Sequence, residues 1–284
     1  MKKYGLISFM LCLGGAIPAH EGLRIATYNI RREGKESQAK YSWNQRKDQV
    51  IDLIHSMSPD IIAFQEVVRS QFDDLIVAMP GYGFFGDPRG SKKRGLMQRI
   101  AMRCATNDYC PLFYNKKRLK CLSSGTFGLN PRNRVFRAWL PRICTWGLFE
   151  DKLTGSQFYV CNIHLENAKG ADRIRAKQLK KVTNFIAENT QGLPVLVLGD
   201  FNTQLEGKVQ RELARAGFVS IRHSAELIVG PAETRTGWEN SQLKVIDHIV
   251  WKTESGRAMR YEVVASRPGV FPSDHRPVYA DIVL

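Results

Sequence analysis

The sequence predicts one α/β domain built on mixed β-sheet. Stretches typical of strands and helices alternate from residue 23 to the end of the 284-residue chain, and many connections have the length of turns between antiparallel neighbours. No internal repeat, Pro-rich linker or low-complexity tract interrupts this alternation. A hydrophobic content of 43% supplies a normal core. We therefore expect residues 20–284 to form a single domain.

The first half of the domain is predicted to place two helices among strands. Residues 23–30 alternate like a strand, and the apolar run at 61–66 is typical of a buried one. Apolar positions at helical spacing predict a helix over 44–57, which stops before Pro59, and a second helix over 70–79. Further strands are expected at 111–114, 121–127 and 143–150.

The second half is organised around one buried strand. Residues 195–198 are aliphatic and β-branched, and the run stops at Gly199. Apolar residues on one face predict helices over 172–188 and 208–216, the latter ended by Gly217. Further strands are expected at 158–164, 243–250, 261–265 and 278–283.

The N-terminus is typical of a targeting segment. Lys2 and Lys3 precede an apolar run at 4–17, and small residues up to Ala19 follow. We expect residues 1–19 to be a signal peptide cleaved near Ala19, so that the protein is exported to the periplasm or secreted. A retained anchor is the alternative, although the run is shorter than the ~20 apolar residues of a membrane span.

The charge of the chain favours anionic partners. The 42 Lys and Arg residues outnumber the 27 Asp and Glu residues, which gives a net charge of +15. Such a surface suits nucleic acid or anionic lipid head groups, and no obligate protein partner is indicated. The loop at 87–106 is rich in cations and has no regular period. Its Arg89, Lys92, Lys93 and Arg94 are predicted to bind substrate, and Trp238 is predicted to stack on it.

The cysteines indicate no structural metal site. Five of the six would remain after cleavage, and this odd number leaves at least one free thiol in the monomer. No Cys-x-x-Cys pair exists, so a zinc ribbon is excluded. Cys144 and Cys161 lie in predicted strands and are expected to be small buried hydrophobic residues.

Polar side chains mark the ends of several predicted strands. They are Asn29, Glu66, His164, Asp200 with Asn202, Asp247 with His248, and Asp274 with His275. An Asp-Asn turn alone explains the stretch at 195–202 equally well, but six such ends favour a shared site. Oxygen ligands without thiolates suit Mg²⁺, Mn²⁺ or Ca²⁺. Carboxylates, imidazoles and a hard cation together favour phosphate-ester hydrolysis.

Motifs in order along the chain resemble the endonuclease/exonuclease/phosphatase superfamily, which has the deoxyribonuclease I-like fold. They are Thr-Tyr-Asn at 27–29, Gln-Glu at 65–66, Asn-Ile-His-Leu at 162–165, Gly-Asp-Phe-Asn at 199–202, Ile-Asp-His-Ile at 246–249 and Ser-Asp-His-Arg-Pro-Val at 273–278. Stretches at 41–46, 110–114 and 141–146 are most similar to small secreted bacterial members. The resemblance implies a four-layer α/β sandwich, in which two packed mixed sheets are flanked by helices and the site lies at one rim.

The resemblance also implies which residues hold metal and water. Glu66, aided by Asn29, would hold the divalent ion, and Asp274 would bind this ion or steady the neighbouring histidine. Asp200 would orient or deprotonate the attacking water. Asn202 would donate a hydrogen bond to the phosphate.

Acid–base roles follow from the same resemblance. Asp247 and His275 would form a carboxylate–imidazole pair, in which the carboxylate raises the imidazole pKa and fixes its tautomer. His164 would be the general acid for the leaving oxygen. Asp108 stands where a glutamate commonly supports this first histidine, and Tyr114 is the other predicted supporting residue.

Three hypotheses follow for the function. The leading one is a secreted metal-dependent phosphodiesterase, most consistent with an endonuclease on DNA or RNA, because cationic contacts to phosphates dominate nucleic-acid affinity. The alternative is hydrolysis of phospholipid or phosphoinositide, by a sphingomyelinase-like enzyme or a phosphatase, since anionic membranes also suit a basic surface. A non-catalytic binding protein is disfavoured, because every core position carries a competent side chain.

Overall fold

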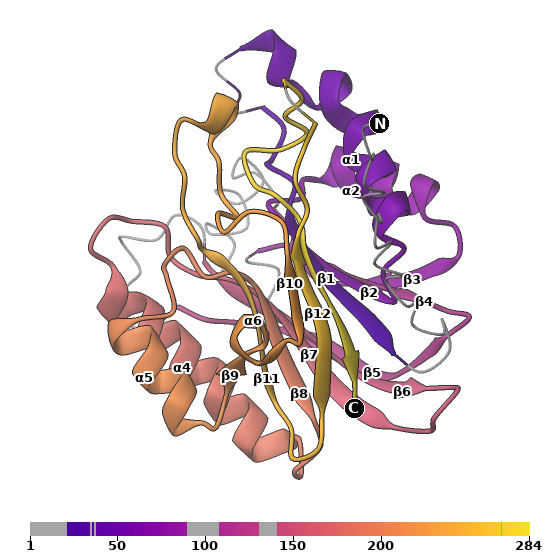
Figure 1. Ribbon diagram of the computed structural model, residues 1–284, viewed down its shortest axis with the longest axis vertical. Coiled ribbons are helices and arrows are strands. Elements are labelled where there is room, and N and C mark those ends of the chain that lie inside the picture. The colour runs from indigo at the N-terminus through magenta and orange to yellow at the C-terminus, as the bar shows by residue number, and fades with distance from the viewer. Residues whose placement is uncertain (1–21, 35, 37, 90–107, 131–140, 268) are drawn as a thin grey trace, which may run out of the picture.

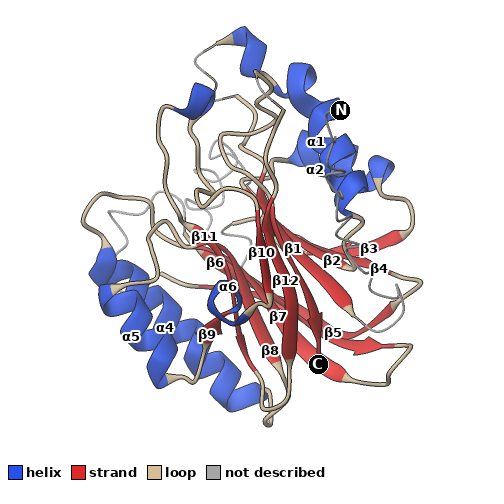
Figure 2. Ribbon diagram, viewed as in Figure 1, coloured by secondary structure: helices blue, strands red, loops and turns tan. Residues whose placement is uncertain are grey.

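Two mixed β-sheets packed face to face form the centre of the protein, and helices cover the outer face of each sheet (Figure 1, Figure 2). The computed structural model describes residues 22–34, 36, 38–89, 108–130, 141–267 and 269–284. The predicted four-layer sandwich is therefore confirmed. The predicted signal peptide and the cations Lys92, Lys93 and Arg94 lie outside the described residues.

The first sheet has seven strands in the order β10-β12-β13-β1-β2-β4-β3. Their bounds are β1 Leu23–Asn29, β2 Ile61–Gln65, β3 Tyr82–Phe85, β4 Leu112–Asn115, β10 Leu227–Val229, β12 Arg257–Val263 and β13 Val278–Val283. Helices α1 (Trp43–Met57) and α2 (Arg69–Ala78) pack on its outer face (Figure 1). Because α1 crosses over between β1 and β2, these two strands run parallel and end at the same edge.

The second sheet has six strands in the order β5-β6-β7-β8-β11-β9. Their bounds are β5 Leu119–Gly128, β6 Ile143–Asp151, β7 Gln157–His164, β8 Val195–Asp200, β9 Val219–Ser220 and β11 Asp247–Lys252. Helices α4 (Asp172–Asn189) and α5 (Gly207–Arg215) cover its outer face (Figure 2). The remaining short helices are α6 (Ile221–Ser224), η1 (Ala39–Tyr41) and η2 (Trp238–Asn240).

Side chains that alternate along the central strands divide the core into three layers. In β1, Ile25 packs between the two sheets, whereas Tyr28 packs under α1 and α2. In β8, Leu198 packs between the sheets, whereas Val197 packs under α4. Successive side chains of a strand point to opposite faces of the sheet. Because both faces are covered here, the side chains on both faces are apolar. The central strands are thereby held rigidly on both sides.

The register of the second sheet brings three predicted site residues to one edge. Asp200, at the end of β8, pairs with His164 of the parallel strand β7 and with Asp247 of the antiparallel strand β11. The strand predicted at 243–250 begins only at Asp247, because the Thr234 hydroxyl accepts the backbone N–H groups of Ile246 and Asp247. Asp247 is therefore the first residue of β11, whereas it was predicted to lie at the end of a strand. The antiparallel direction still brings it to the edge where β8 stops.

Most of the other predicted elements are confirmed to within a few residues. The strands β3, β9 and β10 were not predicted, because two to four residues are too few to show a period. The buried state predicted for Cys144 and Cys161 is confirmed, and both are free thiols, as are Cys110 and Cys121. Among the described helices, none has the length and apolar character needed to cross a membrane.

Candidate active site

Asp200 lies at the centre of a cluster of buried polar side chains. It ends β8, and only 2% of its surface is exposed. The residue before it, Gly199, has a φ of 139°, and a Cβ atom there would lie 1.9 Å from the backbone oxygen of Ile163. Only glycine therefore allows β7 and β8 to approach this closely at their ends. This close approach sets His164 beside Asp200, with Nε2 and Oδ2 3.5 Å apart.

Hydrogen bonds hold the Asp200 carboxylate in place. Oδ2 accepts a bond of 3.0 Å from the Asn29 amide, and Oδ1 accepts one of 2.8 Å from the backbone N–H of Asn202. Burial and the charge of Asp247 raise the pKa of Asp200 to about 7, although His275 and the two hydrogen bonds oppose the shift. Asp200 is therefore placed and tuned to exchange a proton near neutral pH.

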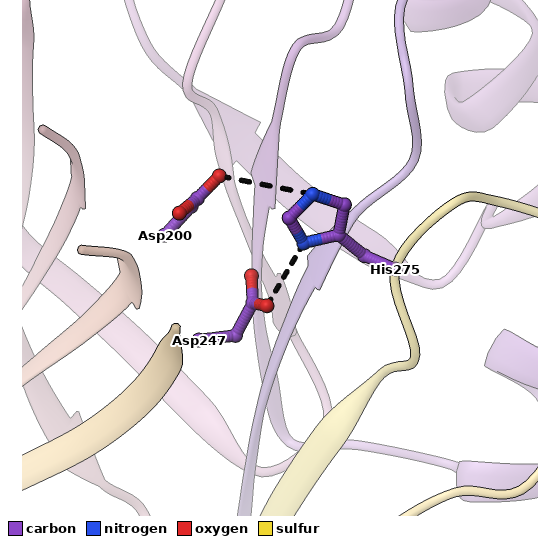
Figure 3. A group of neighbouring side chains, drawn as sticks. All are labelled: Asp200, Asp247 and His275. Atoms are coloured by element: carbon purple, nitrogen blue, oxygen red, sulfur yellow. Dashed lines mark hydrogen bonds and ion pairs between the residues drawn. The ribbon is translucent and has the colours of Figure 1, made fainter. Parts of the chain in front are cut away.

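Asp247 and His275 form the predicted carboxylate–imidazole pair. Nδ1 of His275 lies 2.8 Å from Oδ2 of Asp247, and Nε2 lies 4.0 Å from Oδ2 of Asp200 (Figure 3). Burial lowers the pKa of His275, but the charge of Asp247 and the hydrogen bond to it outweigh this effect and raise it to about 10. The imidazole is thus a cation at neutral pH. The Thr234 hydroxyl donates a second bond of 2.7 Å to Oδ2 of Asp247 and fixes the carboxylate.

Arg89 occupies a different place from the one expected of a substrate-binding cation. It is 5% exposed, and its Nη2 lies 2.9 Å from Nδ1 of His164. Asp108 pairs with Arg89 at 3.4 Å and with Arg32 at 3.1 Å, so the predicted support of His164 runs through Arg89. Burial, together with the charges of Arg142 and Arg89, holds the pKa of His164 well below its ordinary value.

Glu66 and Asp274 form an oxygen-rich cation site. Nη1 of Arg31 lies 3.6 Å from Oε2 of Glu66 and 3.9 Å from Oδ2 of Asp274, so a positive group is held between the carboxylates. Oδ1 of Asp274 is buried and has no hydrogen-bond partner among the described residues. Although burial opposes ionisation, Arg31 and His275 lower the pKa of Glu66, which keeps its charge. Two carboxylates with a free oxygen fit a hard divalent cation.

A second set of donor atoms fits a metal less well. Asp200, Asp247 and His275 offer one ligand atom each, and these atoms lie within 4.8 Å of one another. The Nδ1 atom of His275 is already bonded to Oδ2 of Asp247, which also accepts the Thr234 hydroxyl. These donor atoms are therefore engaged within the protein. Glu66 and Asp274 are therefore the better candidate ligands for a cation, and Asn29, the other predicted ligand, donates its amide N–H to Asp200.

Three residues at the site have left-handed backbone conformations. The φ angles are 55° for Arg31, 61° for Glu66 and 53° for Asn202. Such conformations cost non-glycine residues about 1–3 kcal/mol each and persist where the surrounding structure enforces them. All three line the same cavity. This clustering of backbone strain makes the cavity the candidate functional centre.

The cavity has a volume of about 580 Å³ and opens at the rim of the sheets. His164, Asp200, Asn202 and His275 line it. Further cationic side chains line its walls, namely Lys169, Arg175, Arg235 and Lys244. In the described part of the chain, Lys169 and Lys244 are exposed and form no ion pair. The cavity therefore combines buried acid–base groups with free positive charge at its mouth.

Trp238 and Tyr114 have positions that differ from their predicted roles at the site. The Trp238 ring stacks on Tyr41, with ring centroids 4.1 Å apart, and does not line the cavity. Tyr114 pairs with Ile61, at the opposite end of β2 from Glu66, and packs on Phe149 in the core.

His248, which follows Asp247 in the sequence, has a structural role. Its Nε2 lies 3.0 Å from the backbone oxygen of Thr203, and burial lowers its pKa to about 4. His248 therefore stays neutral.

Three residues that shape the site were not predicted from the sequence. Arg31 lies between the carboxylates of Glu66 and Asp274, Thr234 donates a hydrogen bond to Asp247, and Arg235 lies 3.8 Å from Asp274. Arg31 follows the Asn29 strand end by two positions, a signal that could have identified it. Thr234 and Arg235 lie in an irregular loop without any sequence pattern.

Comparisons with known proteins identify relatives of this chain. The model of the Endonuclease/Exonuclease/phosphatase family matches residues 26–275. Nocturnin of Mus musculus is 26% identical over 209 residues, which are 69% of this chain and 47% of that protein. The match therefore spans about half the length of this curated relative.

Solved structures show the same fold. An endonuclease/exonuclease/phosphatase from Bacteroides vulgatus has a TM-score of 0.80 at 28% identity, over 93% of this chain and 99% of that chain. A mannosyl-6-phosphatase from Bacteroides thetaiotaomicron has a TM-score of 0.77 at 24% identity, over 92% and 100%. TDP2 of D. rerio, complexed with a single strand DNA product, has a TM-score of 0.67 at 18% identity, over 93% and 99%. The last two likenesses concern the fold alone.

Proposed function

Because the chain belongs to the endonuclease/exonuclease/phosphatase family, we propose that it is a metal-dependent phosphodiesterase that cleaves nucleic acid. Members of this family are hydrolases that act on phosphoester bonds, and they generally use divalent metals. The observation that carries the proposal is the arrangement of cations around Asp200. Free ammonium groups of Lys169 and Lys244 line the cavity that contains the acid–base residues.

In this proposal Asp200 is the general base and His275 supplies electrostatic stabilisation. Asp200, with a pKa raised to about 7, orients the attacking water and accepts its proton. His275 carries a positive charge 4.0 Å from Asp200 and stabilises the negative charge that develops on the phosphate. A divalent cation held by Glu66 and Asp274 would act as a Lewis acid on a phosphate oxygen.

The charge distribution supports a substrate with several phosphates. Lys169 follows β7 in the loop before α4, whereas Lys244 precedes β11, so the two cations come from different segments of the cavity wall. A polynucleotide offers phosphates on both sides of the scissile bond, and the net charge of +15 favours the same class of substrate.

The test is parallel hydrolysis of four substrates by the purified protein. These are single-stranded DNA, RNA, a sugar phosphate monoester and mixed phospholipid vesicles, each with Mg²⁺ or with EDTA. Cleavage of nucleic acid that requires the metal and is lost in Asp200→Ala supports the proposal. Turnover of the monoester or of lipid, with nucleic acid left intact, would assign the same site to a different substrate.

We also propose that the protein is exported. The support is the pair Lys2 and Lys3 before the apolar run at 4–17. N-terminal sequencing of protein recovered from periplasm and culture medium tests this. A mature N-terminus near His20 is expected, and an intact Met1 in all fractions would contradict it.

A further inference from the structure

Arg89 lies beneath the catalytic cavity, where it contacts His164 and not solvent. Its Nη2 lies 2.9 Å from Nδ1 of His164, and its Nη1 lies 3.4 Å from Oδ2 of Asp108. The backbone N–H of Arg89 also donates a bond of 2.9 Å to the carbonyl of Asp108. Both side chains are 3% exposed, so the guanidinium is held from two directions.

The chemistry of this contact allows one arrangement of protons. A guanidinium has five N–H donors and no acceptor, and it keeps its charge in proteins. Nδ1 of His164 must therefore be the acceptor, with its lone pair directed at Arg89. In a neutral imidazole, the proton then lies on Nε2, the nitrogen that is 3.5 Å from Oδ2 of Asp200.

We propose that Arg89 is a positioning residue that fixes His164 as the neutral tautomer with its proton on Nε2, so that His164 acts as a fixed hydrogen-bond donor to the phosphate. The hydrogen bond to phosphate rests on the proposed function, whereas the assignment of the tautomer does not depend on it. The resemblance noted in the sequence implies a carboxylate beside this histidine, which would accept a bond from Nδ1. A guanidinium in that place reverses the direction of the bond.

The surroundings of His164 support a permanently neutral ring. It is 2% exposed, and two buried guanidinium groups, of Arg89 and Arg142, act on it together with the His275 cation. These charges and burial hold the pKa of His164 well below its ordinary value, whereas Asp200 is the one carboxylate among the described residues that lies within ion-pair distance of it. If His164 were protonated on both nitrogens, its Nδ1–H group would face the N–H group of Arg89, and two donors would oppose each other. His164 therefore donates a hydrogen bond and keeps its proton, in contrast to the general acid expected from the sequence.

The direct test is the ¹⁵N NMR spectrum of the His164 ring in the whole mature chain without substrate. Comparison with His164→Gln assigns the ring signals. From pH 6 to 8 we expect a pyridine-type signal for Nδ1 and a pyrrole-type signal for Nε2. A protonated Nδ1 or an imidazolium in this range would overturn the proposal, whatever substrate the enzyme cleaves.

Variants separate positioning from simple support of the fold. Arg89→Met should lower kcat at least about tenfold with little change in KM, and should let both ring nitrogens share the proton. Arg89→Lys keeps a donor and should recover part of kcat and the wild-type ring signals. Arg142→Met, which removes the other guanidinium, is the matched control and should keep the wild-type tautomer. Identical ring signals in wild type and a folded Arg89→Met would contradict the proposal.

The pH profile gives a second readout. If His164 keeps its proton, His164→Gln should lower kcat/KM by a constant factor between pH 5 and 9 and preserve each limb of the profile. Loss of one limb in this variant would show that His164 titrates as an acid or base. Such a result would overturn the tautomer assignment but leave the phosphodiesterase proposal standing.

Discussion

Nδ1 of His275 lies 2.8 Å from Oδ2 of Asp247, and both side chains are buried at the edge where β8 and β11 meet. This pair raises the pKa of His275 to about 10. The site thus contains a buried permanent cation, 4.0 Å from the Asp200 carboxylate that is proposed to activate water.

The first prediction concerns stability against pH. The pKa of His275 in the folded protein is raised above its ordinary value of 6.5. The stabilisation that the charged imidazole gives to the folded state is therefore full below pH 6.5 and is lost as the pH rises to about 10. The free energy of unfolding should therefore differ between wild type and His275→Gln by on the order of a few kcal/mol at pH 6, and by much less at pH 10. Urea unfolding in EDTA across this range measures the difference. Parallel curves at all pH values would contradict the raised pKa.

The location of the site was predictable from the sequence, because strand ends repeatedly carried acid, amide or imidazole groups. Asp200 and His164 follow from this pattern, since parallel strands end at one edge. The start of β11 at Asp247 was not predictable, because the Thr234 hydroxyl that accepts the backbone N–H groups of Ile246 and Asp247 lies in the irregular loop before this strand.

The position of Arg89 shows where sequence patterns fail. Arg89 lies near the start of a loop rich in Lys and Arg. The composition of this loop gives no sign that the Arg89 side chain packs inward against His164. Burial of an arginine requires acceptors from elsewhere in the fold, here Asp108 and His164. Such tertiary partners are invisible in a single sequence.

The second prediction concerns the divalent cation. Glu66→Gln should weaken Mg²⁺ or Mn²⁺ binding at least about tenfold, because one of the two carboxylates loses its charge. The shift of the melting temperature on titration with each metal measures binding without substrate. Asp52→Asn, on the exposed face of α1, is the control and should keep the wild-type shift. Equal shifts in both variants would place the cation elsewhere.

The third prediction concerns the cations at the cavity mouth. Lys169→Glu and Lys244→Glu should each weaken binding of single-stranded DNA and reduce the slope of log K against log salt by about 1. Lys120→Glu, exposed on β5 at the far end of the second sheet, makes the same charge change and should leave the slope unchanged. If all three variants weaken binding equally, only the net charge matters.

The fourth prediction concerns the polar link between the sheets. Asn162 accepts a bond from Gln65 and donates to the carbonyls of Phe64 and Pro111, each at 2.8 Å, in the buried interior. Asn162→Leu removes these three buried hydrogen bonds and should lower the free energy of unfolding by ~2–4 kcal/mol. Gln157→Leu, at the exposed start of β7, should change it by under ~0.5 kcal/mol. Urea unfolding measures the free energy of unfolding of both variants. Similar small decreases in the two would show that the Asn162 hydrogen bonds contribute little to stability.

The most direct test of the central claim is the initial rate of cleavage of a single-stranded oligonucleotide by wild type and by Asp200→Asn, with Mg²⁺ and with EDTA. Wild type should cleave only with the metal. Its kcat/KM should rise with pH along a limb at or below about 7, since the pKa of Asp200 is raised to about 7 and a bound cation would lower it from that value. Folded Asp200→Asn should lose at least about 100-fold in rate. Metal-independent cleavage, or full activity of Asp200→Asn, would contradict a phosphodiesterase site centred on Asp200.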